Sequence, residues 1–588
     1  MTAFDAELLA SRAIRSALGC SQWDGVAPRP ESLAANCHMP SGPTDSIAGR
    51  YNRPARALRP VRGLAGLALI LPLAACAVGP NFVTPQASIE TRWKDAGFPA
   101  VTSSRDESQR WWASFRDPTL NRLVDISYNQ NLTLMEAGAR VIEARATLGQ
   151  AIGEFYPQTQ QLSGRADYLQ VSQTDATSNP DNLISSRQFW RVNLGAQAAW
   201  ELDLWGKFRR GVESADAAYL ASIATYDDVL VTLIGDVSSD YIEIRTLQAQ
   251  IAIARENVVK QKEALEIARK RFNGGATSEL DVFQAENVLG QTEAAIPQLV
   301  AQLQQTENAL AVLIGVPPAW IDGLLRRSKG IPPPPREIGT GFPADLLRRR
   351  PDVRAAELKA EAQSAKVGMA AADLYPAFSL GGAFGTLVST TNGNTINQLF
   401  SWPSITYAFG PSFSWPVLNY GQITNQVRAQ DAELQALLLN YKNVVLKAQR
   451  DVENGLAGFV QGRRQVADLK QSATAAGNAL TVAISEYQLG SRDFTTVLTA
   501  EQNLYQAQNN LAVAAGGLTI SVVTVYRALG GGWQIRAGHE FVNDSNRAEM
   551  RARTNYGDIL PPAGEPQPQA PGLPGPQDVG PTVRPPQW

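Results

Sequence analysis

The chain is poor in the side chains that enzymes use for catalysis and for binding metals. Its 588 residues include three cysteines and two histidines, and the formal net charge is only −2. With so few histidines, neither a histidine metal site nor a Ser–His–Asp relay is expected, and we find no GxSxG, Walker A or GxGxxG motif. The balanced charge gives no reason to expect nucleic acid as a partner. We therefore expect a protein that is not an enzyme and that carries no metal or cofactor.

Long apolar runs and interior prolines are scarce as well. The mean hydropathy is −0.18, and we expect no apolar run long enough for a membrane-spanning helix. No proline occurs from Trp205 to Ile296 or from Val417 to Leu560. Because an interior proline breaks a helix, these two stretches are where long helices can form.

The N-terminal segment has the layout of a secretory signal. Arginines between residues 50 and 62 precede the apolar run GLAGLALILPLAAC, which ends at Cys76. The passage Leu73-Ala74-Ala75-Cys76 resembles a bacterial lipobox, whose cysteine is lipidated and becomes the first mature residue. The alternative is an ordinary cysteine near a standard cleavage site. Residues 1–49 are too long and too mixed for the basic part of a signal, which suggests a start codon assigned too early, with Met39 as one candidate.

The rest of the chain contains a duplication. A shift of 215 residues aligns WELDLWG at 200–206 with WPVLNYG at 415–421, and it also aligns Glu286 with Glu501. Upstream, a shift of 219 residues aligns the Tyr-Pro pair at 156–157 with the pair at 375–376. A solenoid would need more and shorter repeats, so we expect two copies of one unit of about 200 residues.

Each copy is expected to contain a long helical hairpin. After Gly206, Val212, Tyr219 and Tyr226 follow one another at heptad spacing, and the second copy repeats the pattern after Gly421. A helix of about 65 residues would span about 100 Å. Both long helices reach a glycine break and a second helix then returns, which predicts hairpins over 206–315 and 421–530.

Between the shorter first helix and the long hairpin, each copy alternates with a period of two. Apolar residues from Val192 to Leu204 and from Ile405 to Val417 occupy one face, which predicts β-hairpins over 158–204 and 377–418. Such strands fit a soluble sandwich or an outer-membrane barrel, and the lipobox upstream favours the barrel. Four strands cannot close a barrel, and an open edge in lipid leaves backbone groups unpaired. Several chains must therefore share the barrel.

Several motifs resemble the outer-membrane efflux protein family of TolC-like and OprM-like channels. They are CAVGPNFVTP from Cys76, LRRRPDV at 347–353, DVSSDYIEIRTLQAQ at 236–250, and YQLG followed by VLTAE within 487–501. Together they cover residues 76 to about 530. Within the family, they resemble the lipoprotein branch that serves multidrug efflux pumps of the resistance-nodulation-division (RND) type.

The resemblance implies an α+β membrane protein that works as a homotrimer. Two internal repeats, each giving one transmembrane β-hairpin and long α-helices, would form a trimeric twelve-strand β-barrel continued by a twelve-helix periplasmic α-barrel. The implied partners are a periplasmic adaptor (membrane fusion) protein, an inner-membrane RND transporter and outer-membrane lipid. The implied location is the outer membrane of a double-membraned bacterium, with a lipid anchor on Cys76 and the helical part in the periplasm.

Function is expected at the tips of the helical hairpins. By resemblance, the tips contact the adaptor through Gly274, Gly275, Thr277, Leu489, Gly490 and Ser491. The same resemblance assigns the periplasmic aperture to Arg492, Asp493, Thr496, Thr499 and Asp281. Thr496 and Thr499 stand where many members carry aspartates, which argues against an acidic, cation-sensing gate. A capping box with Ser278 is an alternative role for Asp281.

At the opposite end, Trp200 and Trp415 are expected at the membrane interface, where aromatic side chains are favoured. Gly206 and Gly421 would allow the backbone to turn from strand into helix. The passage would occur twice because each chain leaves the membrane twice.

These observations predict a passive outer-membrane channel of an RND-type efflux system that conducts small toxic compounds or drugs. The alternatives are a duct for type I protein secretion, a heavy-metal efflux component, and a trimeric adhesin or spacer. The expected organisation comprises a signal region, two repeats, and segments around them that would form an equatorial region. Its parts are 1–75 (extension and signal), 76–125 (equatorial), 126–318 (repeat 1), 319–345 (equatorial linker), 346–532 (repeat 2) and 533–588 (Pro-rich, disordered tail).

Overall fold

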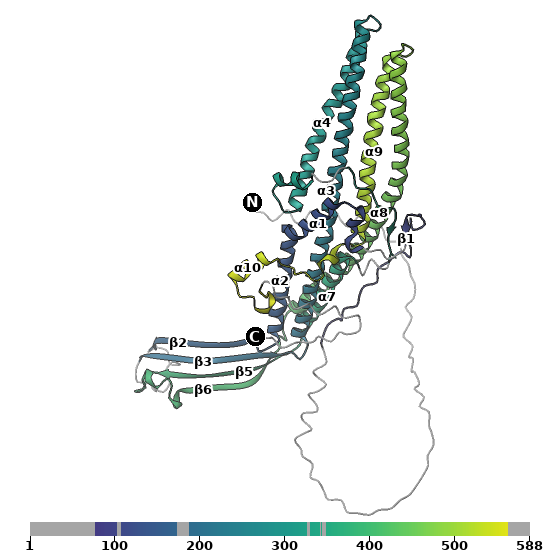
Figure 1. Cartoon of the computed structure of the whole chain (residues 1–588). Coiled ribbons are helices and arrows are strands. Elements are labelled where there is room, and N and C mark those ends of the chain that lie inside the picture. The colour runs from purple at the N-terminus through teal and green to yellow at the C-terminus, as the bar shows by residue number, and fades with distance from the viewer. Residues whose placement is uncertain are drawn as a thin grey trace, which may run out of the picture. The chain divides into compact units, whose positions relative to one another are not determined.

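The computed structural model describes residues 77–102, 108–172, 187–325, 330–341, 343 and 349–562. The predicted lipidation site Cys76, the predicted signal and the stretch 563–588 lie outside the described residues. Figure 1 shows long helices at one end of the described fold and a sheet at the other.

Two very long helical hairpins dominate the fold. The first pairs α3 (Lys207–Asn273) with α4 (Glu279–Leu313), and the second pairs α8 (Gln422–Gln488) with α9 (Phe494–Ala528). These bounds are close to the expected 206–315 and 421–530. The two hairpins stand side by side because α3 packs against α9 (Figure 1).

Shorter elements surround the lower halves of the long helices. The helices are α1 (Pro118–Gln130), α2 (Leu132–Glu154), α5 (Ile321–Leu325), α7 (Pro351–Ala372) and α10 (Asp544–Arg553), and the strands are β1 (Val101–Thr102) and β4 (Ile338–Gly339). β1 and β4 pair in parallel, which brings together the two segments expected in the equatorial region. The main core lies here, where Trp111 and Phe115 pack with apolar residues of α1, α3 and α9.

The second sheet is antiparallel, with strands in the order β2-β3-β5-β6. Its strands are β2 (Thr159–Gln170), β3 (Gln188–Leu202), β5 (Ala377–Ser389) and β6 (Ile405–Ser414). The register places the large exposed apolar side chains of these strands on one face, with Leu387 as the exception: Leu162, Tyr168, Trp190, Leu194, Phe378, Leu380, Phe384, Tyr407, Phe409 and Phe413. The opposite face carries mainly polar and small residues. The chain by itself therefore exposes an apolar sheet face.

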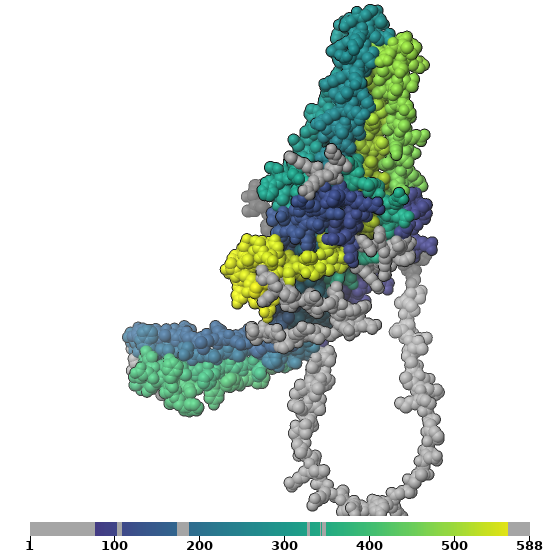
Figure 2. Space-filling view, in the orientation of Figure 1, coloured from purple at the N-terminus to yellow at the C-terminus, as the bar shows by residue number. Residues whose placement is uncertain are grey.

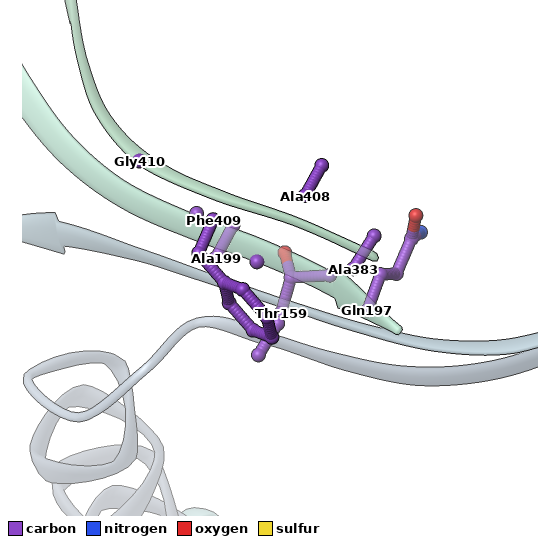
Figure 3. A pocket seen from close by; sticks show the side chains of 10 residues that line it. Thr159, Gln197, Ala199, Ala383, Ala408, Phe409 and Gly410 are labelled. Carbon is purple, nitrogen blue, oxygen red and sulfur yellow. The ribbon is translucent and has the colours of Figure 1, made fainter. Parts of the chain in front are cut away.

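Small side chains leave a shallow hollow on this sheet. Thr159, Gln197, Gly382 and Phe409 are among the residues that line it. Figure 3 shows Phe409 pointing to one side of the sheet, and Gln197 and Ala408 pointing to the other. This arrangement matches the alternation that the sequence predicts for strands with one apolar face.

Hydropathy alone marks two helices as candidates for crossing a membrane. α3 and α9 each contain an 18-residue window apolar enough by length and composition, with mean hydropathies of 1.3 and 1.5, and α4 with α5 would add a third if that pair, bent by 103°, were one span. The expectation that no such run exists is therefore wrong. In both α3 and α9, 56% of the window is buried within the chain, so packing between the long helices accounts for much of this apolar surface.

The expected disordered tail begins too early. Residues 533–562 include α10, and they pack onto α2 and α3 through Phe541, Val542 and Leu560. The backbone of Phe541 lies so close to Gly138 that no side chain would fit at that glycine. Figure 2 shows this C-terminal segment, in yellow, on the surface beside the dark-blue N-terminal part. Its scattered apolar side chains are too few to form a core alone, but they fit a preformed helical surface.

Candidate functional site at the helix tips and at the strand–helix junctions

The two hairpin tips turn in the same way. At the first tip, Gly275 has φ of +73°, its N–H donates to the Phe272 carbonyl (2.9 Å), and the Ala276 N–H donates to the Arg271 carbonyl (2.8 Å). At the second tip, Gly490 has φ of +76° and makes the matching bond to the Tyr487 carbonyl. Both are Schellman turns, in which a left-handed residue ends the helix and satisfies its last carbonyls. Glycine adopts that conformation without a Cβ clash.

Both tips expose apolar side chains beside the glycines. Leu489, which caps the end of α8, is 84% exposed, and Leu280 and Phe283 in the first turns of α4 are also exposed. A soluble helix end normally carries polar residues here. The tips therefore present a surface suited to contact with another protein.

The two tips are linked by a cluster of side chains within one chain. The Tyr487 hydroxyl donates to the Asp281 carboxylate (3.2 Å), and the Thr277 hydroxyl also donates to that carboxylate. The Arg271 guanidinium donates to the Tyr487 carbonyl and lies over the Tyr487 ring, 4.5 Å from its centre. Burial, followed by the charge of Asp281, raises the pKa of Tyr487. Asp281 therefore joins α4 to α8.

The structure does not support the capping-box role for Asp281. The Ser278 side chain makes no cap hydrogen bond at the start of α4. The carboxylate instead turns toward Thr277 and Tyr487. The sequence analysis overlooked Arg271 and Tyr487. The available signal was the repeat itself, because Tyr487 carries a hydroxyl where the first copy has Phe272.

The other residues predicted at the aperture lie on the exposed surface of the second hairpin. The Arg492 guanidinium donates to the Glu486 carboxylate (3.3 Å) within its own hairpin, and Asp493 occupies the N-cap position of α9 without a side-chain cap bond. Thr496 and Thr499 line a groove between α8 and α9 whose other walls are mostly alanine, asparagine and glutamine. The Ser491 hydroxyl donates to the Glu486 carbonyl (3.0 Å).

The strand–helix junctions repeat the same contact twice. The Trp200 indole N–H donates to the Phe155 carbonyl (3.3 Å), and the Trp415 indole N–H donates to the Leu374 carbonyl (3.1 Å). Trp415 lies one residue beyond the end of β6. Gly206 and Gly421 both have positive φ, of +81° and +83°, at the N-caps of α3 and α8. The left-handed residue turns the chain from strand into helix, as the sequence predicts.

The described N-terminus is held at the first junction. The Val78 N–H donates to the Trp205 carbonyl (3.0 Å), and a side chain at Gly206 would stand 2.7 Å from the Cβ of Ala77. The segment after Ala77 then runs beside α7 and α8, where Thr84 and Lys94 donate to glutamates of these helices. Residue 77 thus lies where the sheet meets the long helices.

Comparison with known proteins places this architecture. The family model "Outer membrane efflux protein" matches residues 123–316 and 342–531. The chain belongs to the outer membrane efflux protein family. The pyoverdine export outer membrane protein OpmQ of Pseudomonas putida KT2440 is 30% identical, over 80% of this chain and 98% of that protein. Nodulation protein T of Rhizobium leguminosarum bv. trifolii is 29% identical, over 78% of this chain and 95% of that protein.

A solved relative has the same fold. The structure of the outer-membrane channel OprN matches with a TM-score of 0.72 and 33% sequence identity, over 78% of this chain and all of that chain. The protein is thus an outer membrane efflux channel with a TolC-like fold.

Proposed function

We propose that this efflux protein is the outer-membrane channel of a tripartite RND-type system and that it passively conducts small toxic compounds or drugs out of the cell. OpmQ, its relative over nearly the whole mature length, is an export protein of the outer membrane by name. The channel performs no catalysis and holds no cofactor beyond the lipid on Cys76. The energy for export comes from an inner-membrane transporter, which an adaptor protein connects to the helix tips.

One observation carries the proposal: each chain ends in a sheet that cannot satisfy itself. Within the described strands, β2 and β6 have a partner on one side only, and the apolar face of the sheet is exposed. In lipid, unpaired backbone edges are costly, and closed barrels avoid them. Three copies would form a twelve-strand barrel in the membrane, and their hairpins would continue it as a twelve-helix tunnel through the periplasm.

The N-terminal contact supports a lipid anchor on Cys76. Ala77, the next residue, touches Gly206 at the strand–helix junction, between Trp200 and the start of α3. Aromatic residues at strand ends are typical of the membrane interface. An acyl chain on Cys76 would therefore enter the membrane at the level where the barrel ends.

The tips would form the adaptor contact and the aperture. The exposed Leu489 and Phe283 give an apolar contact surface, and the Asp281–Tyr487 link holds the two hairpins together. Arg492, Asp493, Thr496 and Thr499 would line the opening of the assembled tunnel. Thr496 and Thr499 bring hydroxyls, so the narrowing would depend on packing and hydrogen bonds more than on bound cations.

Single-channel recording tests the function directly. Purified, lipidated protein in a planar bilayer should give discrete conductance steps, and the deletion of its gene should increase drug accumulation in cells. A trimeric spacer would bind the membrane without conducting. Absence of conductance from correctly inserted oligomers would contradict the proposal.

A further inference from the structure

The two β-hairpins of the chain are equivalent residue by residue. Thr159 pairs with Ala199 in the first hairpin, and Ala377 pairs with Ser414 in the second. These partners lie 218 and 215 residues further along. The upstream shift of 219 becomes 218 in the strand because one additional residue, Gln158, follows Pro157 in the first copy. Each hairpin can therefore replace the other in a larger sheet without a change of register.

The contact between the two hairpins serves as a template for a contact between copies. Within the chain, β3 of the first hairpin pairs with β5 of the second, so that Ala198 faces Gly382 and Leu194 faces Thr386. We infer that β6 pairs in the equivalent way with β2 of a neighbouring subunit, with Phe413 opposite Gly164 and Phe409 opposite Tyr168. The inference rests on the proposed multi-copy channel and adds the register of its seam.

The faces of the strands agree with this register. Phe413 and Phe409 lie on the apolar face of β6, and Gly164 and Tyr168 lie on the same face of β2. The chain already contains one such aromatic–glycine pair: the Phe409 ring comes within 2.5 Å of where a Cβ at Gly382 would stand. Phe413 would cover Gly164 of the neighbouring subunit in the same manner. A slip by one residue would bring apolar side chains onto the polar face.

Hydrogen-bond directions agree as well. The Thr390 N–H donates to the Trp190 carbonyl (2.8 Å), and the Val171 N–H donates to the Arg187 carbonyl (2.9 Å). Even-numbered residues of β3 therefore bond toward β5 and odd-numbered residues toward β2, because the direction alternates along a strand. The same alternation leaves the even residues of β2 and the odd residues of β6 directed outward, and these are the residues that the register joins. Pro411, which has no N–H, is one of the outward residues, where proline is tolerated.

The strand–helix junction provides an independent contact. The Trp205 ring stacks on Tyr375 (4.8 Å between centres), and its indole N–H donates to the Pro376 carbonyl (2.8 Å). Tyr420 is the equivalent of Trp205 in the second copy, yet it is 96% exposed and has φ of +48°. The equivalent of Tyr375 is Tyr156. Tyr420 therefore stacks on Tyr156 of the neighbouring subunit, and this contact holds its backbone in the left-handed region.

Disulfide trapping tests the register in the intact, membrane-inserted protein. The variant Gly164→Cys/Phe413→Cys places the two thiols at opposite edges of one chain with β3 and β5 between them, so a bond can form only between copies. The controls are Leu162→Cys/Phe413→Cys and Ala166→Cys/Phe413→Cys, which correspond to slips of two residues in either direction. The Gly164 pair should form covalent oligomers about tenfold faster than either control, because diagonal neighbours lie beyond the usual Cα separation of a disulfide.

The outcomes separate the seam from the channel. Faster trapping of a control pair, or no trapping with any pair, overturns the register if conductance is normal, and the proposed function then stands. Absence of both trapping and conductance overturns both. As a second measurement, Tyr156→Ala and Tyr420→Ala should each lower the temperature at which the oligomer dissociates, and the double variant should lose little more than either single variant. Additive losses would contradict the stack.

Discussion

At the scale of single residues, Glu501 in α9 differs most from its counterpart in the first copy. Glu286 forms an ion pair with Arg269 (2.7 Å), but the second copy has Ile484 where the first has Arg269. Glu501 is 2% exposed, and one of its carboxylate oxygens has no hydrogen-bond partner. Burial raises the pKa of Glu501 to about 7. The second hairpin thus contains a buried acid that prefers to be neutral.

We predict that Glu501 makes stability depend on pH. Below the unfolded pKa the acid is protonated in both states and costs nothing. As pH rises to about 7 the folded state retains its proton longer, so the free energy of unfolding falls by about 3 kcal/mol and then levels off. Glu501→Gln should abolish this fall in urea titrations at pH 5 and pH 8. Glu286→Gln is the matched control and should keep the wild-type profile; equal effects of both variants would refute the assignment.

The links at the tips belong to the same scale. Tyr487→Phe removes the hydroxyl that donates to Asp281, and Arg492→Ala removes the partner of Glu486. Each change loosens the second hairpin, so each should raise the open probability of single channels and the leak of antibiotics through the outer membrane. Asp281→Asn added to Tyr487→Phe should produce little further change, because the two residues share one link. Unchanged conductance and permeability in the Arg492 variant would exclude it from the aperture.

At the scale of elements, the two strand–helix junctions offer a matched pair of glycines. Both have a φ that costs a non-glycine residue about 1 kcal/mol, but a side chain at Gly206 would also strike Ala77, whereas the nearest atom to one at Gly421 lies 3.6 Å away. Gly421→Ala should therefore lower stability by about 1 kcal/mol, and Gly206→Ala by about 1–3 kcal/mol more. Thermal unfolding in detergent measures the difference. Equal losses would show that Ala77 does not pack against the junction.

At the scale of the whole molecule, the C-terminal segment is fastened to α3 by one buried ion pair. The Arg536 guanidinium donates to both oxygens of Asp227 (2.6 and 3.1 Å), and burial raises the pKa of Asp227 despite this partner. Arg536→Met would leave the carboxylate buried and unpaired, which should cost about 3–5 kcal/mol at neutral pH. The loss should shrink as pH falls, because a protonated Asp227 needs no cation.

Arg527→Met is the control for that prediction. Arg527 pairs with Asp236 at 2.8 Å, but the two side chains are 43% and 41% exposed. An exposed pair contributes at most about 1 kcal/mol, so this variant should differ little from the wild type in thermal unfolding. A loss as large as that of Arg536→Met would mean that burial does not set the cost.

Local pattern in the sequence was enough to predict the main elements. The period of two placed the strands, the proline-free stretches placed α3 and α8, and glycines marked the tips and junctions to within a few residues. These features depend on neighbours in the chain, so a local pattern can determine them. The boundary of the C-terminal tail could not be predicted in this way, because residues 533–562 take their structure from the surface of α2 and α3 rather than from each other.

The sequence by itself determined a duplicated unit of strands and long helices, because periodicity and backbone restrictions act over short distances. Only the tertiary structure decided which side chains meet across the repeats. Asp281 and Tyr487 are 206 residues apart, yet they share a hydrogen bond, and Glu501 is buried without the cation that its counterpart has. Such contacts depend on how four long helices pack side by side, and the spacing of residues along the chain does not encode that packing directly.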